Sequence, residues 1–431
     1  MDPPQGGTVP ETAPDGRRLT PPLYVVVLLA VVLLINYIDR GALGTAGPLI
    51  QRDLHLTNGQ YGMLSSAFFW MYALIQIPVG AIAERFGAHR VLIAGLVVWA
   101  TATAFTGITS TFSTLIALRM MLGLGESVGF PTVSKLLAAV VPVKGLGLAN
   151  GIVAFGYLIG PGVGVVLAGI LIDYVSWRGT FLVFGVCSLL WLIPWLAVRL
   201  PRIATQRSDP SAPTLGMVLS QRGLWGTSLG LFSSNYMWYF ILFWLPGYLV
   251  KERGFSMHAM EHVATAGYLV NGLSAFIVGW AIDRYVVRGG SANFAYKLIM
   301  FIAHAACVPC MLAMGLGTES MAIAGMFGFQ IMMGASSPGM YAMSQILAGP
   351  RASGRWVGIQ NSLGNLPGAI SPWVTGIIVD RTGHFALAFV AAALVSVLGI
   401  VGWIGIVPKL APIKWGTPRG VAPPVEEAAP T

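Results

Sequence analysis

Residues 23–40 read LYVVVLLAVVLLINYIDR, an apolar run that ends in an acid and a base. A helix needs about 20 such residues to cross a bilayer. Similar apolar runs recur at 91–105, 153–172, 181–198 and 385–407. Hydrophobic residues make up 55% of the 431 and charged residues 10%, against about 25% charged in soluble domains. The sequence therefore predicts an all-α integral membrane protein.

About twelve transmembrane helices are expected. The expected spans are 22–45, 57–83, 89–109, 113–139, 146–173, 179–199, 222–250, 261–286, 294–316, 320–347, 353–379 and 384–407. The first span is too long for a signal peptide, no small-residue cleavage site follows it, and it carries Asp39 and Arg40. We therefore expect it to remain in the mature protein.

The net charge of +9 is a signal of membrane topology. Of the 25 Lys and Arg residues, 18 lie on the side of the N-terminus, 5 on the other side and 2 inside the spans. Because cytoplasmic loops are rich in Lys and Arg, both termini are predicted to be cytoplasmic. No nucleic-acid partner is expected. The absence of an N-x-[ST] sequon and a short central linker favour a multi-pass protein of a bacterial inner membrane.

The chain divides into two halves of similar size. We expect a disordered tail at 1–20, a six-helix bundle at 21–200, a cytoplasmic linker at 201–221, a second six-helix bundle at 222–408 and a disordered tail at 409–431.

Two strings recur about two hundred residues apart. Gly80–Arg85 (GAIAER) matches Gly279–Arg284 (GWAIDR), and Gly169–Asp173 (GILID) matches Gly376–Asp380 (GIIVD). Matching strings at matching places indicate that the two bundles arose by duplication and are pseudo-symmetric.

The string from Gly80 to Arg90 resembles the loop 2–3 signature of the major facilitator superfamily, with Glu in place of the usual Asp. An acid and an arginine at the cytoplasmic mouth can hold one conformation and separate in the other. The alternative is a charge cluster that only fixes topology. The predicted gating residues are Gly80, Glu84, Arg85, Arg90, Asp283 and Arg284.

Within that superfamily the chain is similar to the anion:cation symporter family, whose bacterial members transport galactonate, glucarate and hexuronates. The matching strings lie at 36–40, 67–78, 119–131 and 244–249. The resemblance implies two pseudo-symmetric six-helix bundles, alternating access, and uptake of an organic anion together with protons.

Four charged residues lie deep inside long apolar segments, and a charge near the middle of a bilayer costs roughly 2.5–3.5 kcal/mol on insertion scales. Arg119 and Glu126 are two helical turns apart and so share one face of a helix, about 10 Å apart along its axis. Burial and a nearby arginine act in opposite directions on a carboxyl pKa, so Glu126 is expected to titrate near physiological pH. The family resemblance implies Asp39 and Glu126 as proton-coupling acids, and Arg40 and Arg119 as ligands of the anion. The alternative is a set of structural ion pairs that ties spans 1 and 4 together.

Polar side chains of other spans are expected to line the substrate site. The predicted binding residues besides the arginines are Tyr37, Tyr72, Tyr157, Tyr341 and Asn361, with Asn235, Tyr239, Gln345 and Asn365 as weaker candidates. Sugar-acid members of the family often carry Gln at the place of Tyr157 and Trp at the place of Tyr341. A site with this composition would also suit an aromatic or short-chain carboxylate.

Other motifs give no competing function. The string from His258 to His262 fits an H-x-x-E-H zinc pattern, but no third ligand lies nearby in the sequence, so no metal is expected. No G-x-x-x-x-G-K-[ST] string occurs, so nucleotide-driven pumping is not supported. Cys307 and Cys310 lie inside an apolar span and are expected to be buried thiols.

We therefore expect a proton-coupled symporter for a small organic anion, a sugar acid or a related carboxylate. Its partners are the anion, protons and the lipid bilayer, with no cofactor, and it is expected to be a monomer and not an enzyme. The alternatives are an uncoupled facilitator or efflux antiporter of the same fold and, from another class, a membrane enzyme or sensor.

Overall fold

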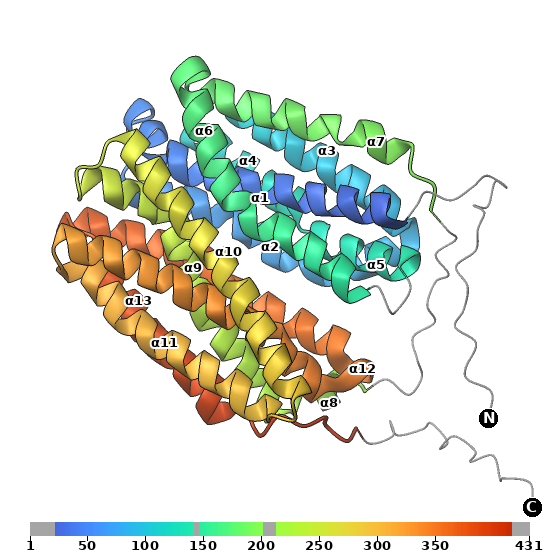
Figure 1. Cartoon of the computed structure of the whole chain (residues 1–431). Helices are drawn as coiled ribbons and strands as arrows, with labels where there is room; N and C mark the ends of the chain where they lie inside the picture. The colour runs from blue at the N-terminus through green and yellow to red at the C-terminus, as the bar shows by residue number, and fades with distance from the viewer. Residues whose placement is uncertain (1–21, 142–145, 201–212, 416–431) are drawn as a thin grey trace, which may run out of the picture.

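The computed structural model describes residues 22–141, 146–200 and 213–415, and these ranges are built of helices without a strand. The helices form twelve spans in two groups of six, as predicted (Figure 1). The predicted tails at 1–20 and 409–431 and the linker lie largely outside the described residues.

The first group holds six spans. Its helices are α1 (Pro22–Asp53), α2 (Asn58–Phe86), α3 (Ala88–Thr106), α4 (Phe112–Glu126), α5 (Gly129–Val140), α6 (Leu146–Leu190) and α7 (Leu192–Leu196). Helices α4 and α5 are two parts of one span. Helix α6 holds two spans, which meet at Ser176, where φ is 61°.

The second group follows a short helix, α8 (Leu215–Leu219). Its helices are α9 (Arg222–Lys251), α10 (Met257–Val287), α11 (Ala292–Leu316), α12 (Glu319–Thr382) and α13 (Ala386–Ile400), which continues as a π-helical segment (Val401–Ile406). Helix α12 holds two spans that meet at Gly349, where φ is 63°. The bends in α6 and α12 occupy different places in the two repeats, since one joins spans 5 and 6 and the other joins spans 10 and 11.

The end predicted for the first span, residue 45, is wrong by eight residues, because α1 continues through Pro48 to Asp53. Membrane helices tolerate proline when neighbouring groups satisfy the freed backbone. Gly41, Gly44 and Gly47, which precede Pro48, let α1 lie close to its neighbours, so packing maintains the helix past the point where the sequence signal weakens.

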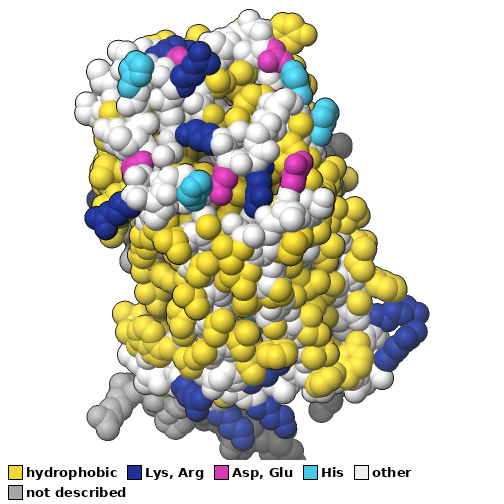
Figure 2. Space-filling view, turned by 90° about the vertical axis from the view of Figure 1, so that its left-hand side faces the viewer, with side chains coloured by type: hydrophobic (Ala, Val, Ile, Leu, Met, Phe, Trp, Pro, Cys, Tyr) yellow, Lys and Arg dark blue, Asp and Glu magenta, His cyan; other side chains and the backbone are white. Residues whose placement is uncertain are grey.

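An apolar belt crosses the visible face of the molecule between two polar ends (Figure 2). Large apolar side chains such as Leu74, Ile193 and Phe276 are 64%, 69% and 74% exposed. Six described helices are long and apolar enough to cross a membrane by themselves. In Figure 2 the lower end carries mainly Lys and Arg, whereas the upper end also carries acids and histidines. The protein is therefore a multi-pass membrane protein.

Close backbone contacts hold each group of six together. A Cβ atom added at Gly123 of α4 would overlap the carbonyl of Phe68 on α2, and one at Gly41 of α1 would overlap the carbonyl of Pro161 on α6. Small residues at such crossings are the usual packing device of membrane helices. The crossing at Gly123 also fixes the distance between α2 and α4, which carry the residues of the candidate site.

The two groups meet along three helix pairs: α2 packs against α12, α1 against α9, and α6 against α10. Their ribbons converge at the end that holds residues 51–58 and 380–385, and diverge toward the end where α1 begins (Figure 1). We call these the joined end and the splayed end. Several polar contacts between the groups lie toward the joined end.

We predict that Gly123→Ala lowers the thermal unfolding midpoint of the purified protein in detergent. Alanine is favoured over glycine in a helix by about 1 kcal/mol, but overpacking costs about 1–3 kcal/mol, so the overlap with α2 dominates. Gly247→Ala in α9 is the matched control, because nothing lies within 4 Å of its added Cβ. Equal midpoints for the two variants would contradict the close approach of α2 and α4.

Candidate functional site

A buried ion pair joins α1 to α4. The Nε and Nη2 atoms of Arg40 donate to Oε2 of Glu126 at 3.3 and 3.0 Å, and the two side chains are 4% and 0% exposed. Helical spacing placed Arg119 on the same face of α4 as Glu126, but the direct partner of Glu126 is Arg40. The other carboxylate oxygen of Glu126, Oε1, is buried and has no protein partner.

Aromatic rings enclose the Arg40 guanidinium. Its central carbon lies 4.4 Å from the ring centroid of Tyr37, 4.9 Å from that of Phe68 and 5.0 Å from that of Tyr72. Ring faces attract a cation in this geometry, most strongly away from water. Tyr37 and Tyr72 therefore lie together beside Arg40.

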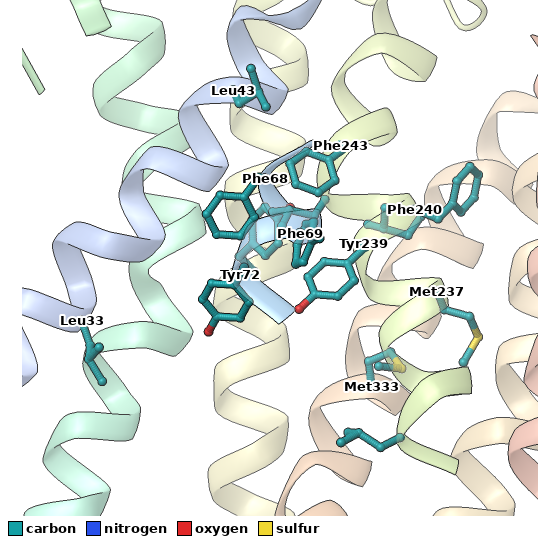
Figure 3. Close-up of a cluster of buried hydrophobic side chains, with 14 of the residues drawn as sticks. Leu33, Leu43, Phe68, Phe69, Tyr72, Met237, Tyr239, Phe240, Phe243 and Met333 are labelled. Carbon is teal, nitrogen blue, oxygen red and sulfur yellow. The ribbon is translucent and has the colours of Figure 1, made fainter. Parts of the chain in front are cut away.

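The cluster continues across the boundary between the bundles. Figure 3 shows Phe68, Phe69 and Tyr72 of α2 facing Tyr239 and Phe243 of α9. The Phe69 and Tyr239 ring centroids are 4.4 Å apart. The residues around Arg40 therefore sit where the two bundles meet.

Asn36, one turn before Arg40, belongs to the same site although sequence reasoning did not select it. Its Oδ1 accepts from Arg40 Nη2 at 3.3 Å, while its Nδ2 is buried without a partner. The pair thus presents a guanidinium and a free amide donor together. The sequence signal that could have identified Asn36 was its position four residues before Arg40 inside an apolar span, because residues at i and i+4 are neighbours on a helix.

The second acid and base lie on another side of the same bundle. Asp39 is 1% exposed, and its Oδ2 accepts from the hydroxyl of Thr103 on α3 at 3.0 Å, while its Oδ1 has no protein partner. The guanidinium of Arg119 lies 5.4 Å from the ring centroid of Phe181 and interacts electrostatically with Asp39. Arg119 also interacts electrostatically with Glu126, so both arginines act on that acid. Thr103 is a second residue that sequence reasoning missed, since nothing in its local sequence marks it.

The remaining predicted binding residues flank this site from both bundles. Tyr157 of α6 packs 5.4 Å from Tyr37, centroid to centroid. On α12 the hydroxyl of Tyr341 donates to Oδ1 of Asn361 at 3.0 Å. The side-chain Nδ2 of Asn365 donates to the same oxygen at 3.2 Å. The second bundle thus contributes a set of polar groups already bonded to one another.

The zinc-like string does not form a metal centre in the part of the chain that the structure describes, where no group of three or more metal-ligating side chains occurs. His258 lies 3.7 Å from Asp173 and 3.7 Å from Glu261. His258 and Glu261 border a pocket of about 360 Å³ between α6 and α10.

The pattern that defines the Major Facilitator Superfamily matches residues 29–372. The chain belongs to this superfamily. The hexuronate transporter of Bacillus subtilis is 27% identical over 89% of this chain and 94% of that protein. The D-galactonate transporter of Escherichia coli O6:H1 is 26% identical over 92% of this chain and 97% of that protein. The resemblance to bacterial organic-anion transporters is thereby confirmed, and so is the prediction of a transporter rather than an enzyme.

A solved structure supports the fold independently. A bacterial homologue of the human lysosomal transporter Spinster, inward-facing and unoccupied, superposes with a TM-score of 0.74 at 20% identity, over 90% of this chain and 97% of that one. This likeness confirms the major facilitator fold of two six-helix bundles.

The loop 2–3 signature of the superfamily lies at the splayed end. Arg85, Arg90, Asp283 and Arg284 are exposed, and among the described residues no ion pair involves Asp283. The side chains of Gly80 and Glu84 lie outside what the structure describes. A gate that separates when this end opens remains a prediction.

At the joined end, the second repeated string supplies a contact that sequence reasoning did not assign. Asp380 accepts hydrogen bonds from the backbone N–H groups of Asn58 (2.8 Å) and Gly59 (2.5 Å) at the start of α2. A carboxylate is stabilised at a helix N-terminus by free N–H groups and the helix dipole. Lys251 of α9 donates to Gln51 of α1 at 2.6 Å beside it. The sequence signal that could have identified Asp380 was the internal repeat, because Asp380 and Asp173 lie at the ends of matching spans.

We predict that Thr103→Val moves the half-maximal pH of transport upward. The hydroxyl donates to the ionised form of Asp39, so its loss makes protonation easier. Uptake measured over a pH series gives the shift. Thr106→Val is the matched control, since the Thr106 hydroxyl donates only to Ala102 O in its own helix. A shift of the same size in both variants would mean that Thr103 has no specific effect on Asp39.

We predict that Asp380→Asn speeds hydrogen–deuterium exchange in residues 57–62, because the amides of Asn58 and Gly59 lose a charged acceptor. Asp53→Asn is the control. It removes the same charge at the same end, but Asp53 pairs with Arg178 inside the first bundle. Unchanged exchange in the Asp380 variant would exclude this contact between the bundles.

Proposed function

We propose that this protein is a proton-coupled symporter that takes up a small organic anion by alternating access. The observation that supports this most is the Arg40–Glu126 pair, which is fully buried yet leaves one Glu126 oxygen without a partner. Such pairs are weak contributors to stability, and apolar residues often serve as well. A pair that exchanges partners during transport gives a reason for its presence.

Coupling follows from competition for Arg40. A planar guanidinium can bind a carboxylate through two parallel hydrogen bonds. Two N–H groups of Arg40 donate to one oxygen of Glu126, so Glu126 and a substrate carboxylate would compete for the same donors. Protonation of Glu126 removes its charge and frees Arg40 for the carboxylate of the anion. Proton and anion therefore increase each other's affinity.

The charge balance favours uptake. In the empty site the positive charges of Arg40 and Arg119 offset the negative charges of Asp39 and Glu126. With both acids protonated and a monoanion bound, one net positive charge remains. An inward-negative potential then favours inward movement by about 2.3 kcal/mol per 100 mV.

The names of the relatives suggest the substrate class. Hexuronate and D-galactonate are both sugar acids with one carboxylate. We extend this to the present chain as a sugar acid or related carboxylate.

We further propose that both termini lie in the cytoplasm of a bacterial inner membrane and that a monomer carries out transport. Under this topology the splayed end faces the cytoplasm, and the described arrangement is inward-open. The contacts of Asp380 and Lys251 would then close the outer side.

We predict that Glu126→Gln abolishes accumulation of the anion above equilibrium in proteoliposomes with an imposed inward proton gradient. Glutamine can still accept a hydrogen bond from Arg40, but it cannot take up and release a proton. Exchange of labelled for unlabelled anion should persist. Glu319→Gln, the same change at an exposed helix start, should leave accumulation intact. If the Glu126 variant still accumulates the anion in response to the proton gradient, as the parent protein does, Glu126 does not carry the proton. Gradient-independent uptake by the parent itself would favour a facilitator or an efflux antiporter.

A further inference from the structure

We propose that this site prefers an aromatic monocarboxylate, with its carboxylate on Arg40 and Asn36 and its ring among the side chains of Tyr37, Phe130 and Tyr157. The inference rests on the proposed function and narrows its substrate class. Three features of the site support it: one cation beside the rings, few unpaired polar groups, and aromatic side chains that surround that cation.

The site offers one cation. Arg119 lies over Phe181, and the acid Asp39 already offsets its charge. In the second bundle, every Lys and Arg that the structure describes lies near a helix end or near the bend at Gly349. A second carboxylate on the substrate would therefore enter a low-dielectric region without an opposite charge, which is costly. The site suits a monoanion.

One carboxylate fits the donors beside Arg40. The free Nδ2 of Asn36 and the guanidinium of Arg40 lie next to each other, and both are donors. Asn36 is 1% exposed, so an unpaired amide there is costly unless a ligand or water accepts from it. A carboxylate that replaces Glu126 on Arg40 supplies that acceptor.

Most of the polar side chains of the second bundle that were predicted to bind substrate already have partners. Tyr239 donates to Asn365 at 2.6 Å, Tyr341 donates to Asn361, and Asn365 donates to Asn361 as well. Asn235 donates to the Gly364 carbonyl at 2.6 Å. A polyhydroxy acid that enters the site would lose its hydrogen bonds to water and find few replacements here. Such an imbalance strongly disfavours a polar ligand.

The walls beside Arg40 are rings that can pack on a flat substrate. Tyr157 lies 5.3 Å from Phe130 and 5.4 Å from Tyr37, and Phe130 lies 6.3 Å from Tyr37, centroid to centroid. These three partly buried side chains, from α1, α5 and α6, meet at one place. The three rings pack on one another in tilted and edge-to-face pairs, and because each is only partly buried, a further ring can pack against the free side of this cluster. A benzene ring attached to the carboxylate on Arg40 can take this place.

The test is equilibrium binding of four acids to the purified full chain by isothermal titration calorimetry, with no proton gradient. Benzoate is expected to bind about tenfold tighter than cyclohexanecarboxylate, the scale of favourable ring contacts. Benzoate should also bind tighter than glucuronate, which carries hydroxyls, and tighter than phthalate, which carries a second carboxylate.

A substitution tests the wall directly. Tyr157→Gln should weaken benzoate binding and strengthen glucuronate binding, so the ratio of the two affinities falls. Tyr174→Gln is the matched control, because Tyr174 is 82% exposed at the joined end, and it should leave the ratio unchanged. A ratio that falls equally in both variants would overturn the role of Tyr157.

The outcomes separate this inference from the proposed function. Tighter binding of glucuronate than of benzoate would overturn the aromatic preference, and gradient-driven uptake of glucuronate would still support proton symport. Tighter binding of benzoate with uptake indifferent to the gradient would support the aromatic preference and overturn the coupling.

Discussion

The candidate site depends on one buried ion pair, that of Arg40 and Glu126. Two charges cannot be taken out of water unless their partners are placed accurately. That requirement fixes the approach of α1 to α4, and the glycine crossings at Gly41 and Gly123 allow neighbouring helices to pack as closely as the pair demands. The rings of Tyr37, Phe68 and Tyr72 then exclude water from the guanidinium and attract it. The pair is thus both the reason for the tight packing and the group that the proposed transport cycle uses.

The two acids have different surroundings within one bundle. Glu126 faces Arg40 and the boundary between the bundles, whereas Asp39 faces Thr103 and the bundle interior. This separation suits a division of tasks in which one acid responds directly to the anion and the other sets the charge of the bundle. Each acid keeps one oxygen without a protein partner, where a proton or a water molecule can bind. The site lies at the meeting of the bundles, so a change in its charge bears on their relative position.

The joined end shows how the internal repeat serves the contact between bundles. Asp380 ends one repeated string and accepts from the first amides of α2, while Asp173 ends the other string and lies beside His258 at the start of α10. In each case an acid from one bundle meets the N-terminal end of a helix from the other. Helix N-termini attract carboxylates, so duplication of one string supplied two contacts across the boundary. At the splayed end, where the ribbons diverge, the described residues form no equivalent contact.

The sequence by itself determined the membrane class, the twelve spans, the duplication and the presence of charges at Asp39, Arg40, Arg119 and Glu126. Each of these follows from local composition and spacing, because a bilayer imposes length and polarity on every span separately. Only the tertiary structure decided that Glu126 pairs with Arg40 rather than with its helical neighbour Arg119. It also showed that Asn36, Thr103 and Asp380 contact residues of the site or of the other bundle. It further showed that α1 continues beyond Pro48. Such pairings depend on how helices rotate and cross, and helix rotation is set by packing between residues far apart in the chain, which no local pattern records.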